Sequence, residues 1–280
     1  MRAVADVMHS STSTVSQQIA ALSREVGAAL LEPEGRRVRL TPAGRRLANH
    51  AVNILAAVDV AKADLNPGAN PAGVVTIASY ATAARRALIP LMRNLNSTYP
   101  AVTVRVQELE PDEAHEALLA GRVDLALAYD YNLAPAAPDE SIAVLRLWES
   151  QWGLAVAAGT EPKGNNSAVG LFNFYAGAKW IGNSRNPAEE VVIRTLASLA
   201  QSDARIEHHA DNLELVEDLV RSGSGVGLLP LDRYPSGVRV LPLEAPNVVM
   251  RTWAWTKKGA ETWPPLALVL DTFTRGFIRR

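Results

Sequence analysis

Residues 11–44 read STSTVSQQIAALSREVG followed by AALLEPEGRRVRLTPAG, and they decide the organisation of the chain. The first half predicts a helix, because Ser11 and Thr12 are good N-caps and apolar residues then recur at spacings of three and four. The other face of this helix carries hydroxyl and amide side chains, which can hydrogen-bond to base edges and phosphates. They are Thr12, Ser13, Ser16, Gln17 and Gln18.

A second, shorter helix is expected just before this one. Residues 3–9, AVADVMH, have one apolar face, and the following HSS makes a tight break. A helix, a short turn and a helix with a polar start are typical of a helix-turn-helix that enters the major groove of DNA. An ordinary helical hairpin with a solvated polar face fits the same residues.

The second half of the stretch predicts a basic β-hairpin. Gly35 can form its turn, and Val38 and Leu40 alternate with arginines as in a half-buried strand. Residues 35–46 contain no acidic residue, and a basic hairpin after a helix-turn-helix is typical of a wing that contacts phosphates. A solvated charge run is the alternative. The arginines of the run are Arg36, Arg37, Arg39, Arg45 and Arg46.

These residues together resemble the winged helix-turn-helix of the LysR-type transcriptional regulators. The resemblance rests on STSTVSQQIAAL, on Gly27 with Leu30-Leu31-Glu32, and on RRVRLTPAG, in which Leu40-Thr41-x-Ala43-Gly44 is the most specific part. It implies a DNA-binding head at residues 1–46. Thr12, Ser13, Ser16 and Gln17 would read bases, while Gln18, Arg36, Arg37 and Arg39 would hold phosphates.

The chain departs from the family pattern in three places. Family members usually have a whole helix before the point where this chain begins. They also have an acidic residue near Ser23 and an arginine near Pro33, and both are absent here. We therefore expect the head to be incomplete, Met1 to be an internal start and the natural protein to be longer.

Composition limits the kind of protein. The chain has 280 residues, enough for two or three domains, and a formal net charge of −1, so any affinity for DNA must come from a local patch. It has no cysteine, which excludes disulfides, thiol catalysis and cysteine metal sites and fits a cytoplasmic protein. No signal peptide and no apolar run of membrane-spanning length is present, so we expect no membrane partner.

A long helix and a flexible joint follow the wing. Residues 42–65 show an apolar helical stripe of small and branched side chains, which suits packing against a second copy of the same helix. The resemblance implies a dimerisation helix, and packing within one chain is the alternative. Residues 66–73, NPGANPAG, predict a linker, so residues 47–73 form the expected connection between domains.

Residues 74–280 predict a two-lobed α/β domain, because strand and helix patterns alternate at crossover spacing. The first parallel strands are expected at 74–79, 102–107 and 123–129. We further expect strands in IAVLRLW and WGLAVAA, a loop at 161–170, and closing strands in VRVLPL and VVMRTWAWT. The first lobe would comprise about 74–155 and 257–280, and the second about 156–256.

The fold class is therefore α/β behind an N-terminal winged head and a long helix. The resemblance implies an effector domain like a periplasmic solute-binding protein, with a cleft crossed by strands near 152–158 and 248–256. In such open sheets ligands bind beyond the carboxyl ends of the strands.

Polar residues after these strands are the candidate effector ligands. Thr82 opens a helix, and its alternative role is simple N-capping. Arg185 suits an anionic effector, and its alternative is a surface arginine. Asp211 and Asn212 are expected mainly to cap a helix. The candidates are Ser79, Tyr80, Thr82, Glu110, Tyr129, Asn183 and Arg185.

Enzyme interpretations find little support. The acidic cluster Glu108, Glu110, Asp112, Glu113 and Glu116 surrounds a predicted helix start, where acids favour the dipole, and a solvated face is expected. The five histidines lie at no metal-ligand spacing, and GSGVG lacks the spacing of a nucleotide loop. Trp253, Trp255 and Trp263 are expected in core or interlobe packing. We expect no catalytic residue, metal or cofactor.

The sequence thus predicts a DNA-binding transcriptional regulator that responds to a small-molecule effector, for which an anion is one expectation. Its expected partners are double-stranded DNA and further copies of itself, as a homodimer or homotetramer. The alternative is a small-molecule-binding protein that has lost DNA binding through N-terminal truncation.

Overall fold

The computed structural model describes residues 4–5, 8, 10–35, 37–65, 70–137, 139–159 and 167–277. The chain forms two compact units, and along the chain the division falls between residues 67 and 68. Within the described ranges, no helix has both the length and the apolar character needed to cross a membrane.

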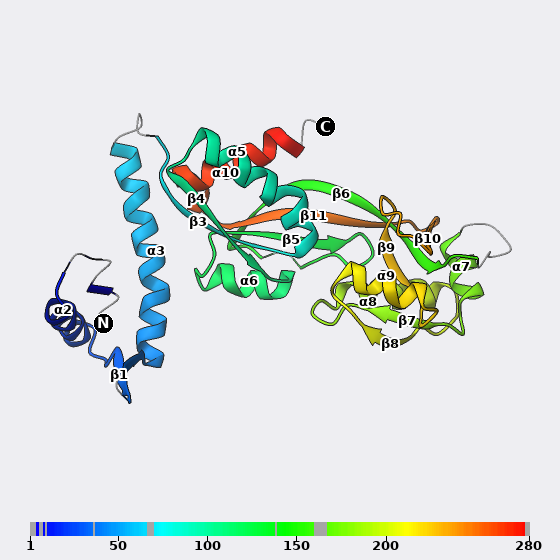
Figure 1. Ribbon diagram of the computed structural model, residues 1–280, viewed down its shortest axis with the longest axis horizontal. Coiled ribbons are helices and arrows are strands. Elements are labelled where there is room, and N and C mark those ends of the chain that lie inside the picture. The colour runs from blue at the N-terminus through cyan, green and yellow to red at the C-terminus, as the bar shows by residue number, and fades with distance from the viewer. Residues whose placement is uncertain are drawn as a thin grey trace. The chain divides into compact units, whose positions relative to one another are not determined.

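The first unit contains the predicted helix, hairpin and long helix (Figure 1). Helix α2 spans Thr12–Glu25, and the Ser11 hydroxyl caps it by accepting a hydrogen bond from the amide of Thr14. Strands β1 (Leu31–Glu34) and β2 (Arg37–Leu40) pair antiparallel, and α3 spans Pro42–Leu65. These three expectations are confirmed.

Two expectations in this unit fall partly on residues that are not described. Of the short helix expected at residues 3–9, only Val4, Ala5 and Met8 are described, and the amide of Met8 donates to the carbonyl of Val4 at helical spacing. Residues 66–69 of the expected linker also lie outside the description.

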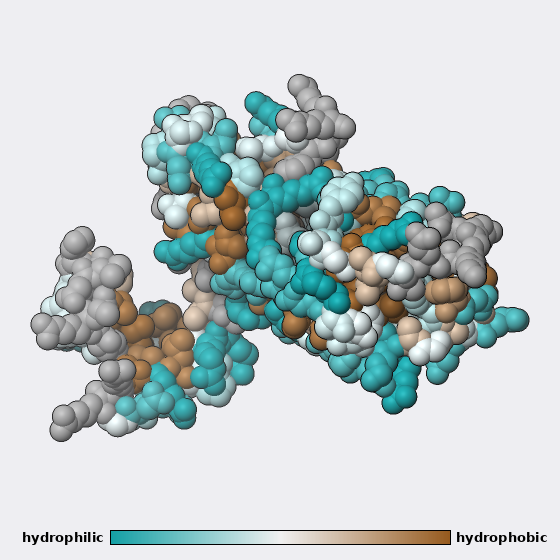
Figure 2. All heavy atoms as spheres, turned by 45° about the vertical axis from the view of Figure 1, so that its right-hand side comes forward, coloured by the Kyte–Doolittle hydropathy of each residue, from teal (hydrophilic) through white to brown (hydrophobic). Residues whose placement is uncertain are grey.

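Apolar side chains remain exposed on the first unit. Figure 2 shows brown atoms gathered on it at the lower left. The exposed residues include Leu22, Val26, Val38 and Leu40. Because large apolar side chains gain free energy when they leave water, this surface can be covered by further protein.

The Thr41–Gly44 turn joins the wing to α3. The Thr41 hydroxyl donates to the carbonyl of Ala29 at 2.6 Å and accepts from the amide of Gly44 at 2.9 Å. A Cβ on Gly44 would lie 2.1 Å from the carbonyl oxygen of Leu30. The most specific part of the sequence signature is therefore a packing requirement, since only glycine lets α3 begin this close to the chain before β1.

The second unit is built on a seven-stranded sheet with the order β10-β6-β11-β5-β3-β4, in which β9 also pairs with β6. The pairs β3·β4 and β3·β5 are parallel, as expected for the first strands, while β11 runs antiparallel to both β5 and β6. The strands are β3 (Gly73–Ser79), β4 (Val102–Glu108), β5 (Leu125–Tyr131), β6 (Ile142–Ala157), β9 (Gly227–Pro230), β10 (Val238–Pro242) and β11 (Val248–Lys257).

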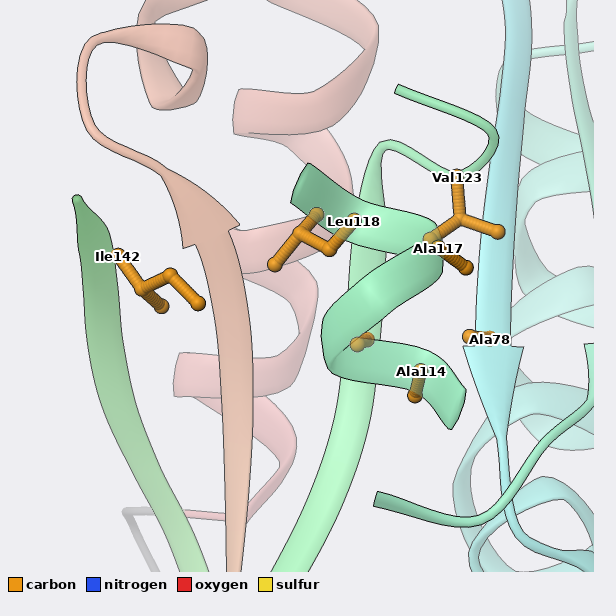
Figure 3. Close-up of a cluster of buried hydrophobic side chains, with 7 residues drawn as sticks. Ala78, Ala114, Ala117, Leu118, Val123 and Ile142 are labelled. Carbon is orange, nitrogen blue, oxygen red and sulfur yellow. The ribbon is translucent and has the colours of Figure 1, made fainter. Parts of the chain in front are cut away.

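Helices cover this sheet in the first lobe. Small residues let α6 pack closely on the strands: Figure 3 shows Ala114 and Ala117 of α6 beside Ala78 of β3, with Leu118 toward Ile142 of β6. The helical segments of this lobe are α4 (Ala81–Ala83), the π-helical turn η1 (Ala84–Leu88), α5 (Ile89–Thr98), α6 (Pro111–Leu119), the 3-10 turn η2 (Ala260–Thr262) and α10 (Pro264–Phe277).

The second lobe has its own core. Ile181, Val216, Val220 and Leu229 are buried together there with Ala155 of β6. Its elements are α7 (Ala168–Phe174), β7 (Lys179–Gly182), α8 (Ala188–Leu199), β8 (Arg205–His209), α9 (Leu213–Arg221), β9 and β10, and β7 and β8 form a separate parallel pair.

Three expectations about this unit are corrected. The segment expected as two strands is the single strand β6. The expected loop at 161–170 contains the start of α7, while residues 161–166 lie outside the description. The second crossing lies just before β11 rather than along it, because β10 belongs to the second lobe and β11 begins at Val248, opposite Trp152 of β6.

The glycine requirement at the wing junction predicts a specific loss of stability. We expect Gly44→Ala to destabilise the first unit by about 1–3 kcal/mol, because the added methyl group must displace the Leu30 carbonyl. Scanning calorimetry measures the loss. Gly276→Ala, a helical site with nothing within 4 Å, is the matched control and should leave stability unchanged or slightly raised. Equal behaviour of the two variants would contradict the requirement.

Candidate functional site

A cavity of about 390 Å³ lies between the two lobes of the second unit. From the first lobe it is lined by the ends of β3 and β5, by the residues after β4 and by the start of α4. From the second lobe it is lined by the loop after β7, the start of α8 and the β8–α9 connection. Its position beyond the carboxyl ends of parallel strands is where open α/β sheets bind ligands.

Six of the seven candidate effector residues line this cavity. They are Tyr80, Thr82, Glu110, Tyr129, Asn183 and Arg185. Ser79 does not line it: its side chain is fully buried, and its hydroxyl donates to the carbonyl of Tyr80 at 3.0 Å. The capping alternative for Thr82 is wrong, because Tyr80 is the N-cap of α4 and no side chain among the described residues bonds to that helix start.

One wall of the cavity is aromatic. Edge-to-face contacts join Tyr80 to Tyr129 at 4.7 Å between ring centroids, Tyr129 to Tyr131 at 6.0 Å, and Tyr131 to Trp152 at 5.5 Å. Burial raises the pKa of all three tyrosines, so they stay neutral. The buried indole N–H of Trp152 has no partner within the described part of the chain.

Glu110 corrects the expectation of a solvated acidic cluster. Asp112 and Glu116 are exposed as expected, but Glu110 is only 6% exposed and accepts a hydrogen bond from the Tyr129 hydroxyl at 2.8 Å. Burial raises the pKa of the Glu110 carboxyl above its usual value, and the Tyr129 hydrogen bond opposes this.

Glu189 is a cavity residue that the sequence analysis misses. It lies in the first turn of α8 and is 8% exposed. Burial, followed by the negative charges of Glu110, Glu190 and Asp211, raises the pKa of Glu189 to about 8. Within the described ranges, no hydrogen bond or ion pair reaches its carboxyl group. Its only signal in the sequence is an acid shortly after the candidate loop Asn183–Arg185.

Two ion pairs link the lobes beside the cavity. The Arg185 guanidinium donates to the carboxylate of Glu113 on α6, and the Arg85 guanidinium lies 3.8 Å from that of Glu214 on α9. The hydrogen bond to Glu113 raises the pKa of Arg185, and the same bond lowers that of Glu113. Arg185 is therefore not a free surface arginine.

The polar loops of the second lobe are ordered by their own side chains. The Asn183 carbonyl oxygen accepts from the amides of Arg185 and Asn186. Asp211 accepts from both the amide and the hydroxyl of Ser184, and Asn212 caps α9 through the amide of Glu214. Of the two expected caps, Asn212 is confirmed, while Asp211 holds the neighbouring loop instead.

The tryptophans and histidines lie elsewhere. Trp263 is buried in the first lobe, whereas Trp253 and Trp255 line a second cavity of about 210 Å³ together with His115. In the part of the chain that the structure describes, no group of three or more histidine and acidic side chains could hold a metal ion.

The predicted DNA-contacting face of α2 is exposed. Val15 is buried on the opposite side, as the apolar stripe predicts. The exposed residues are Thr12, Ser13, Ser16, Gln17 and Gln18.

The wing arginines are only partly described. Arg39 pairs with Glu32 at 2.7 Å and reaches Glu34 at 3.8 Å, because the hairpin places these β1 acids opposite β2. Arg36 and the side chain of Arg37 lie outside the description.

Comparison with known families decides the identity of both units. Residues 68–277 match the LysR substrate binding domain, and residues 1–45 match the bacterial regulatory helix-turn-helix protein, lysR family. The chain belongs to the LysR family. It is a DNA-binding transcriptional regulator whose second unit is an effector-binding domain, so the alternative without DNA binding is not favoured.

Curated relatives of this LysR-family chain are regulators. CysB of Haemophilus influenzae is 28% identical over 159 residues, a match that covers 56% of this chain and 47% of CysB, about half its length. The hydrogen peroxide-inducible genes activator of Pectobacterium carotovorum is 28% identical over 252 residues, covering 88% of this chain and 81% of the relative. These names are of transcriptional regulators rather than enzymes.

Solved structures share the fold. A full-length OxyR variant from Pseudomonas aeruginosa has a TM-score of 0.73 at 18% identity and covers 98% of this chain and 90% of its own. Full-length CbnR in complex with its target DNA has a TM-score of 0.55 at 21% identity, with 98% and 92% covered.

The buried Glu189 predicts an unusual pH dependence of folding. Between its ordinary pKa of 4.5 and its folded-state pKa of about 8, the folded protein holds a proton that the unfolded chain releases. Stability therefore falls as the pH rises through this window. We expect Glu189→Gln to remove this fall, which makes the variant more stable than the parent near pH 8 by on the order of a few kcal/mol.

Urea unfolding at about pH 5 and about pH 8 measures this difference. Glu140→Gln, at an exposed position of the same unit, is the control and should keep the parent's pH dependence. A Glu189→Gln variant that loses stability as steeply as the parent would show that the Glu189 carboxyl is already ionised in the folded protein.

Proposed function

We propose that α2 reads DNA bases through Thr12, Ser13, Ser16 and Gln17, while Gln18 and the wing arginines Arg36, Arg37 and Arg39 hold phosphates. The observation that supports this is the free polar face of α2 opposite the buried Val15. An exposed helix face of hydroxyl and amide groups can enter the major groove. Because the target is DNA, we place the protein in the cytoplasm.

We propose that α3 joins two copies of the chain. Ile54 and Val58 lie one helical turn apart on α3 and are 60% and 42% exposed. Burying such a stripe against the same stripe of a second copy removes apolar surface from both. The result is a homodimer with two recognition helices, and pairing of effector domains would extend it to a homotetramer.

We propose that the effector binds in the cavity between the lobes and that its binding changes the arrangement of the heads on DNA. The lobes share β6 and are otherwise linked beside the cavity by the ion pairs of Arg185 and Arg85, so a ligand there touches both. A ligand that prefers one lobe arrangement shifts the population toward it.

The charge of the effector depends on which cavity side chains are free to meet it. The expectation of an anion depends on a free Arg185, and this guanidinium is already paired with Glu113. An anion would have to compete with a carboxylate for it. The geometry thus gives the anionic expectation little support.

The names of some relatives raise hydrogen peroxide as a possible signal for this chain. Several relatives of this chain are named as activators of hydrogen peroxide-inducible genes. The 280 residues here contain no cysteine, so they offer no thiol for a peroxide to oxidise. We therefore propose a reversibly bound small molecule as the effector.

The wing assignment predicts how DNA binding depends on salt. We expect Arg36→Ala/Arg37→Ala to weaken binding to specific and unrelated DNA alike and to reduce the slope of log K against log salt by roughly one per lost phosphate contact. Fluorescence anisotropy on DNA from beside the gene measures both quantities. Arg146→Ala, on the exposed side of β6, is the control and should change neither. Unchanged affinity of the double variant would refute the wing assignment.

A further inference from the structure

The cavity between the lobes holds more negative than positive charge. Its only two arginines within the described residues, Arg85 and Arg185, are each paired with an acid that does not line the cavity. No cation of the described chain pairs with the carboxyl groups that do line it. They are Glu108, Glu110, Glu189 and Asp211.

Two of these acids lie at the most buried part of the cavity. Glu110 and Glu189 come from opposite lobes, one after β4 and one at the start of α8, and both are more than nine-tenths buried. The Tyr129 hydroxyl donates to Glu110, but Glu189 has no hydrogen-bond donor within the described residues. A buried carboxyl without a donor is costly unless it is neutral or meets a cation.

The aromatic wall adds a second, independent feature. Tyr80, Tyr129, Tyr131 and Trp152 form one continuous series of ring contacts, and all four line the cavity. The faces of such rings attract a cation, and this attraction strengthens where water is excluded. Acids and aromatic rings around one small cavity are the chemistry that recognises an organic cation.

We propose that the effector carries a positively charged nitrogen, an ammonium or guanidinium group, which binds against the carboxyl groups of Glu189 and Glu110 beside this aromatic wall. The proposal rests on the proposed function of the cavity as the effector site. The cavity volume of about 390 Å³ suits a small organic molecule. Such a cation touches both lobes at once, because Glu110 belongs to the first and Glu189 to the second.

Binding of a cation would displace the proton of Glu189. Burial raises the pKa of Glu189 to about 8. At neutral pH the Glu189 carboxyl of the empty cavity is therefore mostly protonated, and a binding cation must displace that proton. Affinity for a cation should therefore rise with pH up to about 8, whereas an anion held by protonated Glu189 should bind better at low pH. The charged and titratable groups around Glu189 are Glu110, Tyr129, Tyr131, Arg185, Glu190, His209 and Asp211.

The test uses matched probes of opposite charge on the full chain. Isothermal titration calorimetry compares benzylamine with benzoate, and 1,4-diaminobutane with succinate, at about pH 6 and about pH 8. We expect at least one amine to bind about tenfold more tightly than its matched carboxylate, and more tightly at the higher pH. Glu189→Gln should weaken that amine about tenfold and remove its pH dependence.

A neighbouring variant controls for general electrostatics. Glu190→Gln removes the next acid of α8, which pairs with His209 and does not line the cavity, so it should change amine affinity by less than about threefold. Preferential binding of the carboxylates, or undiminished amine binding by Glu189→Gln, overturns the proposal. Binding of neither class up to about 10 mM overturns it as well.

A cavity-filling variant separates this proposal from the proposed function. Ala81 lines the cavity at the start of α4, and Ala81→Trp should abolish binding of whichever probe the parent binds. If carboxylates bind the parent and not Ala81→Trp, the cavity is an effector site and only the cationic class is wrong. If Ala81→Trp binds the probes as the parent does, the probes bind elsewhere and the cavity is not the effector site.

Discussion

The second unit depends on one long strand that both lobes share. The first part of β6 pairs with β11 in the sheet of the first lobe, and its last residues pair with β10 and β9 in the second. Trp152 stands at the change of partners and lines the cavity. Because the shared strand keeps its backbone hydrogen bonds along its length, the lobes can change their mutual angle only by bending around this crossing. The cavity lies beside that point, so under the proposed function a ligand in it would favour one angle over others.

Charged side chains on the two sides of this crossing both attract and repel the two lobes. The pairs Arg185–Glu113 and Arg85–Glu214 draw the lobes together, although such partly exposed pairs contribute little each. The carboxyls of Glu110 and Glu189 face the same cavity from different lobes and repel one another when ionised. The arrangement of the two lobes therefore depends on whether these two acids are neutralised. This makes it responsive to a ligand, because a ligand acts only through its differential affinity for two states.

Much of the fold could be predicted because it follows from local patterns. The helix α2, the wing and α3 follow from periodicity and turn residues, and the alternation of strands and helices places candidate ligands at strand ends. The polar residues Glu149–Gln151 interrupt the apolar pattern of β6, but pairing with β11 continues through them. The remaining features of the site depend on contacts between residues far apart in the sequence, which no local pattern reveals. Arg185 meets Glu113 across 72 residues of sequence, and Glu189 resembles any first-turn acid until the opposite lobe buries it.

The two units of the chain differ in how strictly their structure limits the residue at a given position. At the wing junction, backbone approach permits only glycine at residue 44, so the signature there reflects geometry common to every chain that makes this turn. In the cavity, the scaffold of strand ends and helix starts fixes where side chains lie but not which side chains they are, because they line a space between the lobes. A head with familiar residues can therefore accompany a cavity of unusual charge. Under the proposed function, the acids of that cavity, rather than the fold, determine what the regulator senses.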